Sequence, residues 1–453
     1  MNQNPINIAY ALNDKYAEMT CVSMCSVITN CENSEIVFHL FAEDLSLEQA
    51  ERISVLSAEN VNIRIELHNI RIDGELFVTA DYTGLGAPNL TKEAYAPIMM
   101  PDLLPDLERL LFLDCDTIIE GNAAEIWQAD LGGFLVGMAP DYSLTPKELK
   151  KQILGMGESD VYYNTGVILM DIAGLRRFGL PQIVKENVAR LYKQSVEAEL
   201  SWFADQDVLN YALRGKIKKL PMRYNSYFWQ SLPLGESIEE CIEAYLNPVI
   251  VHFIGTPKPT ELGNVPVNLP EWERYYKYKA MTPYANDADE IRTALQKKRE
   301  ENTLEAFMPV FDENTIHWYS FHFAKQMFAL AAKRYRLTVN GKKIVVWGLN
   351  NRTWTLAVYL AAHGMEVKGI VDGLESNHGI RVFYSAVEPP EILRGTVGDT
   401  FVMLDMRNYD IARQVMAELR SWGYSEDDFC YVYAPIWEGT GALGESTAIS
   451  RSS

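Results

Sequence analysis

At 453 residues the chain is longer than one typical domain, so two domains are expected. Its hydrophobic content of 48% and charged content of 23% are those of an ordinary globular protein. The formal net charge of -20 argues against non-specific binding of nucleic acid and against a broad basic surface for anionic lipid.

The sequence shows no signal for membrane insertion or export. No stretch of about eighteen uninterrupted apolar residues predicts a membrane span. Residues 1–6 lack the basic start and apolar run of a signal peptide, and the six cysteines form no tight metal-binding pattern. We therefore expect a cytoplasmic protein, with a peripheral position at the inner face of the membrane as the alternative.

The beginning of the chain alternates between strand and helix patterns. Strands are expected over residues 6–11, 36–41 and 61–67, and helices over residues 16–29 and 46–57. Alternation of this kind indicates βαβ units and a parallel sheet. Residues 91–104 have helical spacing up to Pro97 and Pro101.

Residues 110–119 contain an apolar run that ends in Asp114 and Asp116. Side chains two residues apart share a face of a strand, and ligands of α/β sheets bind beyond the carboxyl ends of the strands. Two carboxylates in that position suit Mn²⁺ or Mg²⁺ shared with a substrate's phosphates. The alternative is a strand that simply stops in a polar turn.

Further elements follow before residue 270. Strands are expected over residues 133–139, 162–171 and 249–253, and a helix opens at residues 205–210. His252 ends the last of these strands, where a histidine is more often a structural residue than a ligand. The turn after it contains Gly255, which permits close approach of a phosphate, and Lys258, which adds a cation.

The composition changes beyond residue 270. Charged and aromatic residues mix at helical spacing, which predicts a helical connector, and a second βαβ pattern begins at Lys342. In that second pattern Gly348 starts a loop that resembles a phosphate-binding loop but lacks its later glycines, and Asp372 ends the next strand. A structural or partner-docking role is favoured there over dinucleotide binding. The expected domains are residues 1–285, a connector at 286–340, a Rossmann-like domain at 341–440 and a flexible tail at 441–453.

Five segments, in this order and spacing, resemble glycosyltransferase family 8, the retaining nucleotide-sugar glycosyltransferases that include lipopolysaccharide galactosyltransferases. They are residues 8–11, 112–116, 163–167, 205–210 and 252–259. The resemblance covers about three fifths of the chain. It implies a GT-A-like fold, with a mixed, mostly parallel sheet and helices on both faces.

The residues alone also support a metal site for a diphosphate. Mn²⁺ held by Asp114, Asp116 and His252 would bridge the phosphates of a nucleotide-sugar donor, and an imidazole ligand favours Mn²⁺ over Mg²⁺. The resemblance implies these ligand roles for the three residues, and donor-binding roles for Gly255 and Lys258.

The resemblance also implies a donor pocket. Asn164, Asp205 and Gln206 would line the sugar, with Gln206 at the face of the anomeric carbon and Asp205 beside it as the second catalytic candidate. Asp141 matches a sugar-contacting acid, and Ala11 and Asn13 would lie at the base. The other residues expected at the donor are Tyr16, Cys115 and Thr165. Asn164 could instead be a turn residue, and Gln206 a first-turn helix residue.

Two positions depart from the family pattern. Asn13 stands where many members have an acidic residue, and Pro97 stands where many have an arginine near the donor. No convincing pair of close carboxylates is present for glycosidase-type chemistry, which agrees with the front-face retaining mechanism of the family.

The resulting hypothesis is transfer of glucose or galactose from a UDP-sugar to a glycan, a lipid-linked sugar or a glycoprotein. Two alternatives remain: a catalytically inactive nucleotide-sugar-binding scaffold, and a haloacid-dehalogenase-type phosphatase, whose first motif resembles residues 113–117. Neither a nucleic acid nor a membrane span is expected, and the C-terminal domain could support a homo-oligomer or dock a partner.

Overall fold

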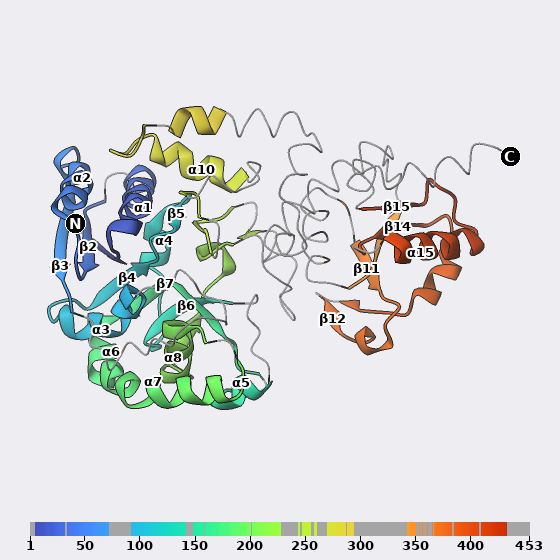
Figure 1. Ribbon diagram of the computed structural model, residues 1–453, viewed down its shortest axis with the longest axis horizontal. Coiled ribbons are helices and arrows are strands. Elements are labelled where there is room, and N and C mark those ends of the chain that lie inside the picture. Colours follow the sequence, from blue (N-terminus) through green and yellow to red (C-terminus); the bar gives the residue numbers. More distant parts are fainter. Residues whose placement is uncertain are drawn as a thin grey trace. The chain divides into compact units, whose positions relative to one another are not determined.

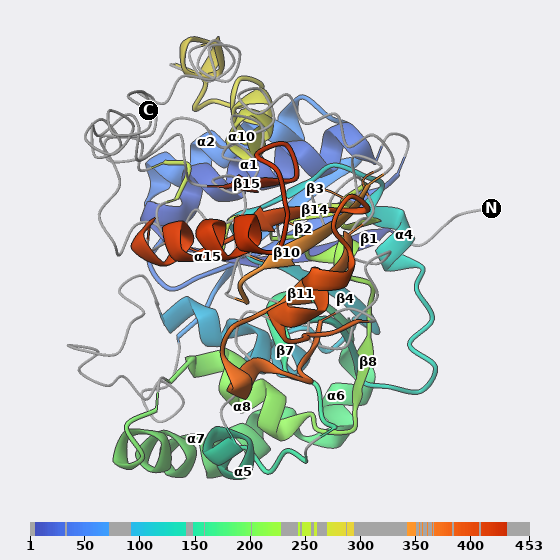
Figure 2. The same ribbon diagram turned by 90° about the vertical axis from the view of Figure 1, so that its right-hand side faces the viewer.

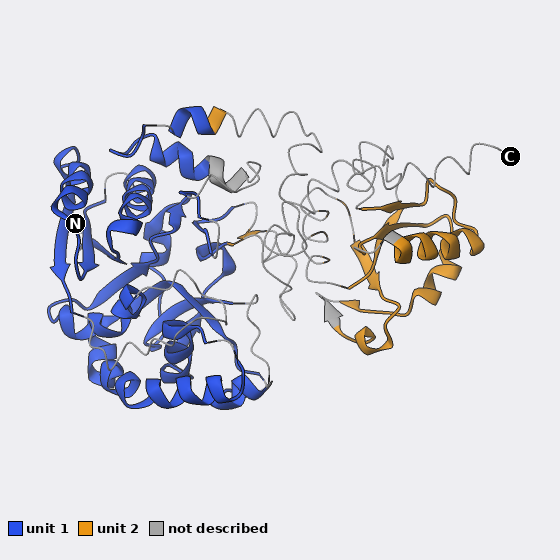
Figure 3. Cartoon of the chain, in the orientation of Figure 1, with its two compact units in different colours: residues 1–226, 247–260, 274–291 blue, residues 227–246, 261–273, 292–453 orange. Residues whose placement is uncertain are grey.

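The structure is a computed structural model that describes residues 5–31, 34–71, 92–141, 148–157, 159–200, 202–227, 243–244, 247–254, 258–260, 270–286, 288–293, 342–349, 353, 356, 360, 365, 367–382, 385–406 and 409–432. The chain divides into two compact units, shown in Figure 3. The first comprises residues 1–226, 247–260 and 274–291, and the second comprises residues 227–246, 261–273 and 292–453. Each unit is described by itself.

Within its described residues, the first unit is built on a seven-stranded sheet in the order β3-β2-β1-β4-β7-β6-β8. The strands are β1 (Ile6–Ala11), β2 (Ile36–Ala42), β3 (Ile63–Asn69), β4 (Arg109–Leu113), β6 (Val136–Pro140), β7 (Tyr163–Asp171) and β8 (Ile217–Lys219). In this sheet β7 runs antiparallel to both its neighbours, and the other adjacent pairs are parallel. The predicted mixed, mostly parallel sheet is confirmed.

Helices cover both faces of this sheet (Figure 1), and Figure 2 shows the same layers from the side. One face carries α1 (Ala17–Asn30) and α2 (Leu47–Ala58). The other carries α3 (Ala96–Leu103), α6 (Ile172–Phe178), α7 (Leu180–Glu197) and α8 (Ala204–Ala212). On the second face Ala9, Phe112 and Ile168 form a continuous apolar core with residues of these four helices. Burial of this core is the main favourable term for the fold.

Shorter elements complete the first unit. They are α4 (Ala123–Trp127), α5 (Glu148–Ile153), 3-10 turns at Asp14–Tyr16, Lys92–Tyr95 and Met222–Tyr224, and residues 274–279 of α10 (Pro270–Lys279). The predicted helix over residues 91–104 is thus a 3-10 turn followed by α3. Pro97 lies in the first turn of α3, where no backbone N–H is needed, and Pro101 lies inside the helix.

One predicted strand begins three residues later than expected, and one short strand was not predicted. The strand expected over residues 133–139 begins only at Val136, because Gly132 and Gly133 adopt φ angles of 59° and 87° and form a turn. After β4, the chain turns at Asp114–Asp116 and forms β5 (Thr117–Ile119), which the sequence analysis did not anticipate. This strand pairs antiparallel with β9 (Ile250–His252), and Thr117 lies opposite His252.

The described part of the second unit contains a four-stranded parallel sheet in the order β11-β10-β14-β15. Its strands are β10 (Lys343–Trp347), β11 (Val367–Val371), β14 (Thr400–Leu404) and β15 (Phe429–Tyr431). The other elements are α15 (Tyr409–Ser421), the short pair β12 (Arg381–Val382) and β13 (Ser385–Ala386), and 3-10 turns at Glu375–Asn377 and Pro390–Gly395. The predicted second α/β domain is therefore present.

Some predictions fall on residues that the structure does not describe. These are Gly255, most of the connector at 286–340 and the tail at 441–453. Among the described residues, no helix is long and apolar enough to cross a membrane.

Candidate active site

Three segments meet at the carboxyl end of β4. Because β7 runs antiparallel to β4, its first residues lie beside the turn that contains Asp114, and Asp114 N donates to Gly166 O at 2.8 Å. Pairing of β5 with β9 brings His252 to the same place. The apolar strands thus fix the backbone, and the polar residues at their ends converge.

Asp114, Asp116 and His252 form a compact cluster. His252 Nε2 lies 3.2 Å from Asp116 Oδ1 and 3.6 Å from Asp114 Oδ2. The three ligand atoms lie within 4.8 Å of one another, close enough to bind one ion. The side chain of His252 is 3% exposed and that of Asp116 is 10% exposed, whereas Asp114 remains 42% exposed. The cluster is therefore held by the fold and open on the side of Asp114.

Gly166 provides the space for this cluster. A Cβ atom at this position would lie 2.1 Å from His252 Cε1 and 2.8 Å from Asp114 Oδ2. Only a glycine permits the backbone of β7 to approach the imidazole and the carboxylate this closely. Gly166 lies in the segment 163–167 that resembles the family, but no role was predicted for it.

Hydrogen bonds determine which nitrogen of His252 carries the proton. Gly166 N donates to Asn164 Oδ1 at 2.9 Å, so the group of Asn225 that meets the same oxygen at 2.7 Å must be its NH₂. Asn225 Oδ1 then faces His252 Nδ1 at 2.9 Å, and the proton lies on Nδ1. In the neutral imidazole, His252 Nε2 therefore presents a lone pair to Asp114 and Asp116. A lone pair and two carboxylates facing one another suit a bound cation.

Lys258 supplies positive charge to one side of the cluster. Its Nζ donates to Asp116 Oδ2 and, at 2.8 Å, to Phe253 O. Burial alone would raise the pKa of Asp116, but the charge of Lys258 outweighs burial and holds that pKa well below its usual range. The pKa of Asp114 is raised, by desolvation on the side that faces the protein and by the charge of Asp116. The two carboxylates therefore differ strongly in their affinity for a proton.

Beside the cluster lies a network of buried polar side chains. Asn164 Nδ2 donates to Gln206 Oε1 at 3.1 Å and to Asp141 Oδ2 at 3.3 Å, and Gln206 Nε2 donates to the same Asp141 oxygen at 3.0 Å. Thr165 Oγ1 donates to Asp205 Oδ2 at 2.8 Å. The structure thus brings the residues predicted for the sugar together, next to those predicted for the metal.

The residues predicted near the base lie at the end of β1. Cys115 Sγ donates to Ala11 O at 3.1 Å, which ties the Asp114–Asp116 turn to β1. Asn13 caps the 3-10 turn that ends at Tyr16, accepting from Lys15 N at 3.1 Å. Asn13 Nδ2 also donates to Glu93 Oε2 at 3.3 Å, so a buried carboxylate accompanies Asn13.

Two site residues had no signal in the sequence. Asn225 and Glu93 belong to segments without a recognised motif, and their partners lie 27 and 80 positions away in the chain. Pro97, where an arginine was expected, is buried in the first turn of α3.

Comparison with known proteins agrees with this architecture. The family described as Glycosyl transferase family 8 matches residues 7–259. General stress protein A of Bacillus subtilis (strain 168) is 22% identical over 287 residues, which are 62% of this chain and 94% of that protein. Lipopolysaccharide 1,3-galactosyltransferase of Salmonella typhimurium is 24% identical over 292 residues, which are 62% of this chain and 80% of that protein.

A solved structure supports the fold. A crystal structure of an active-site mutant of LgtC superposes with a TM-score of 0.50 at 20% sequence identity, over 61% of this chain and 96% of that one. The first unit therefore has a GT-A-like fold. The family match extends over more than half of the sequence, and the chain belongs to glycosyl transferase family 8.

Proposed function

We propose that the chain transfers a hexose, glucose or galactose, from a UDP-sugar to a glycan, lipid-linked or protein acceptor with retention of configuration. The observation that carries the proposal is the convergence of Asp114, Asp116 and His252 beside the amide network of Asn164 and Gln206. Family membership supports transferase chemistry, and the relatives named above include a lipopolysaccharide galactosyltransferase.

The donor atoms of the cluster fit Mn²⁺, with Mg²⁺ as the alternative. Two carboxylates and one imidazole are a typical ligand set for Mn²⁺, and Gly166 leaves the space that a side chain would fill. When bound, the ion would act as a Lewis acid on the diphosphate of the donor. Asn225 orients His252 toward it, and Lys258 keeps Asp116 ionised at neutral pH.

Around the sugar, this chain supplies two amides, Asn164 and Gln206, and two acidic groups, Asp141 and Asp205. Asn164 and Gln206 hold one another and Asp141, so their positions are set before the donor binds. An amide is a poor nucleophile but can stabilise charge that develops on the sugar. We infer that Gln206 takes this role at the anomeric carbon and that Asp205, fixed by Thr165, supports it. The base would lie against Ala11, Asn13, Tyr16 and Cys115. The rest of the donor pocket would consist of Thr165, Gly255 and Lys258.

The two alternatives are less well supported. A haloacid-dehalogenase-type phosphatase needs a second acidic motif to hold Mg²⁺, but the carboxylate of Asp428 is bonded to Lys342 and Ser425. An inactive scaffold would be expected to have lost a ligand or a network residue, and Asp114, Asp116, His252 and Gln206 are all in place.

Release of UDP from UDP-glucose and UDP-galactose tests the proposal. With Mn²⁺ and an acceptor panel, the wild-type chain should turn over one donor, and EDTA or Asp116→Asn should abolish turnover. Asp102→Asn, an exposed aspartate on α3, is the matched control and should keep wild-type activity. Turnover that persists in Asp116→Asn would contradict the assignment of the metal site.

A further inference from the structure

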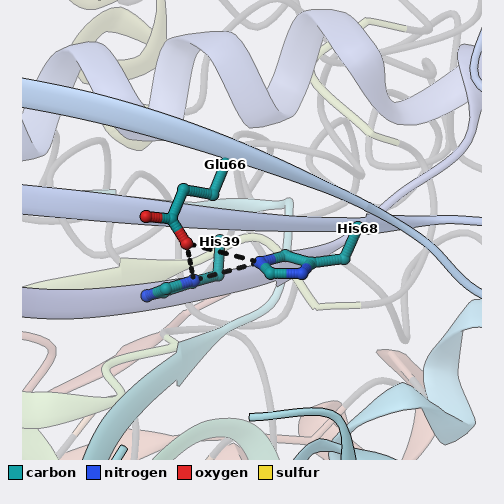
Figure 4. Close-up of side chains that lie close together, drawn as sticks. All are labelled: His39, Glu66 and His68. Atoms are coloured by element: carbon teal, nitrogen blue, oxygen red, sulfur yellow. Dashed lines mark hydrogen bonds and ion pairs between the residues drawn. The ribbon is translucent and has the colours of Figure 1, made fainter. Parts of the chain in front are cut away.

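A second cluster of metal-ligating side chains lies on β2 and β3, in the first unit (Figure 4). The parallel register places His39 beside Glu66, and His68 follows Glu66 by two residues on the same face of β3. The sequence analysis assigned no role to these residues, and the proposed transferase chemistry does not use them.

Distances within this cluster match those between the ligands of a tetrahedral ion. His39 Nδ1 lies 3.1 Å from His68 Nε2 and 3.3 Å from Glu66 Oε2, and His68 Nε2 lies 3.9 Å from Glu66 Oε2. Ligands at about 2.0–2.1 Å from a tetrahedral Zn²⁺ ion are separated from one another by about 3.3 Å. All three atoms could therefore reach one ion with small side-chain movements.

Asn7 orients His39 for this role. Asn7 Nδ2 donates to Pro5 O at 3.2 Å, and a carbonyl oxygen can only accept, so Asn7 Oδ1 is the atom that meets His39 Nε2 at 3.0 Å. The proton of His39 therefore lies on Nε2, and the Nδ1 lone pair points into the cluster. Metal-binding histidines are typically held in this way, by a hydrogen bond from their second nitrogen.

The cluster borders a cavity of about 890 Å³, which lies between the strands and the segment that leads from α3 into β4. Its other lining residues include Arg64, Leu103, Asp106 and Trp127. His39 is 4% exposed, whereas His68 is 26% and Glu66 is 49% exposed. His39 is thus buried, whereas Glu66 and His68 are accessible to an ion from solvent.

We propose that His39 Nδ1, Glu66 Oε2 and His68 Nε2 bind a divalent transition-metal ion of the Zn²⁺ class, with the fourth position open to the cavity. Two imidazoles and one carboxylate are a borderline-soft set that suits Zn²⁺ and disfavours Mg²⁺ and Ca²⁺. Water or an anionic ligand from the cavity can complete a three-residue site of this kind.

This site is separate from the proposed active site. Arg109, at the start of β4, lines the cavity, whereas Asp114 follows the other end of the same strand. The five residues of β4 lead from Arg109 to Asp114, and five residues of extended chain span roughly 16 Å. The two sites can therefore be tested independently.

Zinc binding to the full-length chain tests the proposal. The protein is stripped with chelator and dialysed against a small excess of Zn²⁺, and the metal content per chain is measured by mass spectrometry. The wild type should bind one more Zn²⁺ per chain than His68→Gln, with an affinity at this site at least about 100-fold higher. Co²⁺ in place of Zn²⁺ should give visible absorption bands of a tetrahedral site that are absent from His68→Gln.

Leu67→Gln is the matched control, because Leu67 is exposed and points to the opposite face of the same strand. It should bind as much Zn²⁺ as the wild type. Glu66→Gln should lose the same Zn²⁺ as His68→Gln, and provides a second variant at a half-exposed position. Equal Zn²⁺ content in the wild type and both ligand variants would overturn the proposal, and so would an equal loss in Leu67→Gln. Asp116→Asn should leave this Zn²⁺ in place, so a failure of the proposed transferase function is distinguishable.

Discussion

At the scale of single residues, the proposed chemistry depends on the orientation of His252. The backbone N–H of Gly166 donates to Asn164 Oδ1, which determines the orientation of the Asn164 amide. Asn164 Oδ1 also accepts from the NH₂ group of Asn225, so Asn225 Oδ1 faces His252 and the proton of His252 lies on Nδ1. Each step follows from the rule that a donor must meet an acceptor. Asn225 is therefore a positioning residue for the proposed metal ligand His252.

Replacement of Asn225 tests this chain of hydrogen bonds. Asn225→Leu should weaken Mn²⁺ binding by about 10–100-fold, because loss of a partner of this kind leaves the imidazole free to rotate or change tautomer. Asn225→Asp keeps an acceptor for Nδ1–H and should lose much less affinity. The free Mn²⁺ signal in electron paramagnetic resonance gives both constants. Equal losses in the two variants would show that the acceptor at this position is not what orients His252.

At the scale of elements, α8 is anchored by Asp207. Its carboxylate accepts from Tyr162 Oη at 2.6 Å and from Phe203 N at 2.8 Å, and it pairs with Lys150 Nζ at 2.8 Å. Asp207 is fully buried, and Lys150 is 6% exposed. This anchor fixes the first turn of α8, which presents Asp205 and Gln206 to the site.

Lys150→Met should destabilise the first unit by about 3 kcal/mol, because it leaves a buried carboxylate without its cation. Denaturant unfolding measures the change. Lys193→Met is the control, since Lys193 is 74% exposed and forms a long surface ion pair with Glu197, at 3.8 Å. That change should cost less than about 1 kcal/mol. A similar small cost for Lys150→Met would mean that the buried pair does not anchor α8.

Most strands of the first unit were predictable, because their apolar runs are bounded by turn residues. The direction of β7 was not predictable, since an apolar run such as Tyr163–Asp171 suits a parallel or an antiparallel strand. Nor was β5, which has only three residues and is defined by its pairing with β9. These two elements bring Gly166 and His252 to Asp114.

Some residues of the candidate site were predictable from the sequence and others were not. Asp114, Asp116 and His252 follow apolar strands and could be recognised from the sequence. The roles of Asn225 and Glu93 depend on contacts between segments that are distant in the sequence. The cluster of His39, Glu66 and His68 likewise depends on the register between β2 and β3, which the sequence does not give. No local pattern records such contacts.

In the second unit, Asp372 has a structural role. Its Oδ2 accepts from Leu349 N at 2.6 Å and its Oδ1 accepts from Leu374 N at 2.8 Å. Gly348 has a φ angle of 117°, and a Cβ there would lie 2.5 Å from Asp405 O. The glycine is thus required by close packing, and a backbone donor of the loop already bonds a carboxylate of the chain itself. A structural or partner-docking role for this domain, in preference to dinucleotide binding, stays a prediction.

At the scale of the whole molecule, the partly buried carboxylate of Asp205 makes stability depend on pH. Burial raises the pKa of Asp205 from 3.8 to about 7, although the Thr165 hydroxyl partly opposes the shift. Between these two values the folded chain binds more protons than the unfolded chain. Stability contributed by this group is therefore present at low pH and is lost as pH rises through 7.

Asp205→Asn removes this dependence. At pH 8 the variant should be more stable than the wild type by about 1–2 kcal/mol. This value is smaller than the free energy that corresponds to the whole pKa shift, because the side chain is only partly buried. At pH 4 the two proteins should be equally stable. Thermal unfolding at both pH values measures the difference, and a gain that is the same at pH 4 and pH 8 would contradict the raised pKa.

The central claim is that Asp114, Asp116 and His252 hold a divalent ion to which the diphosphate of the donor binds. Calorimetric titration of the full chain with UDP, in Mn²⁺ and in EDTA, tests this claim most directly. We predict that UDP binds in the presence of Mn²⁺, and that EDTA or His252→Gln weakens binding at least about tenfold. His378→Gln, in the second unit, should change nothing. Equal binding of UDP with Mn²⁺ and with EDTA, or undiminished binding to His252→Gln, would contradict the account.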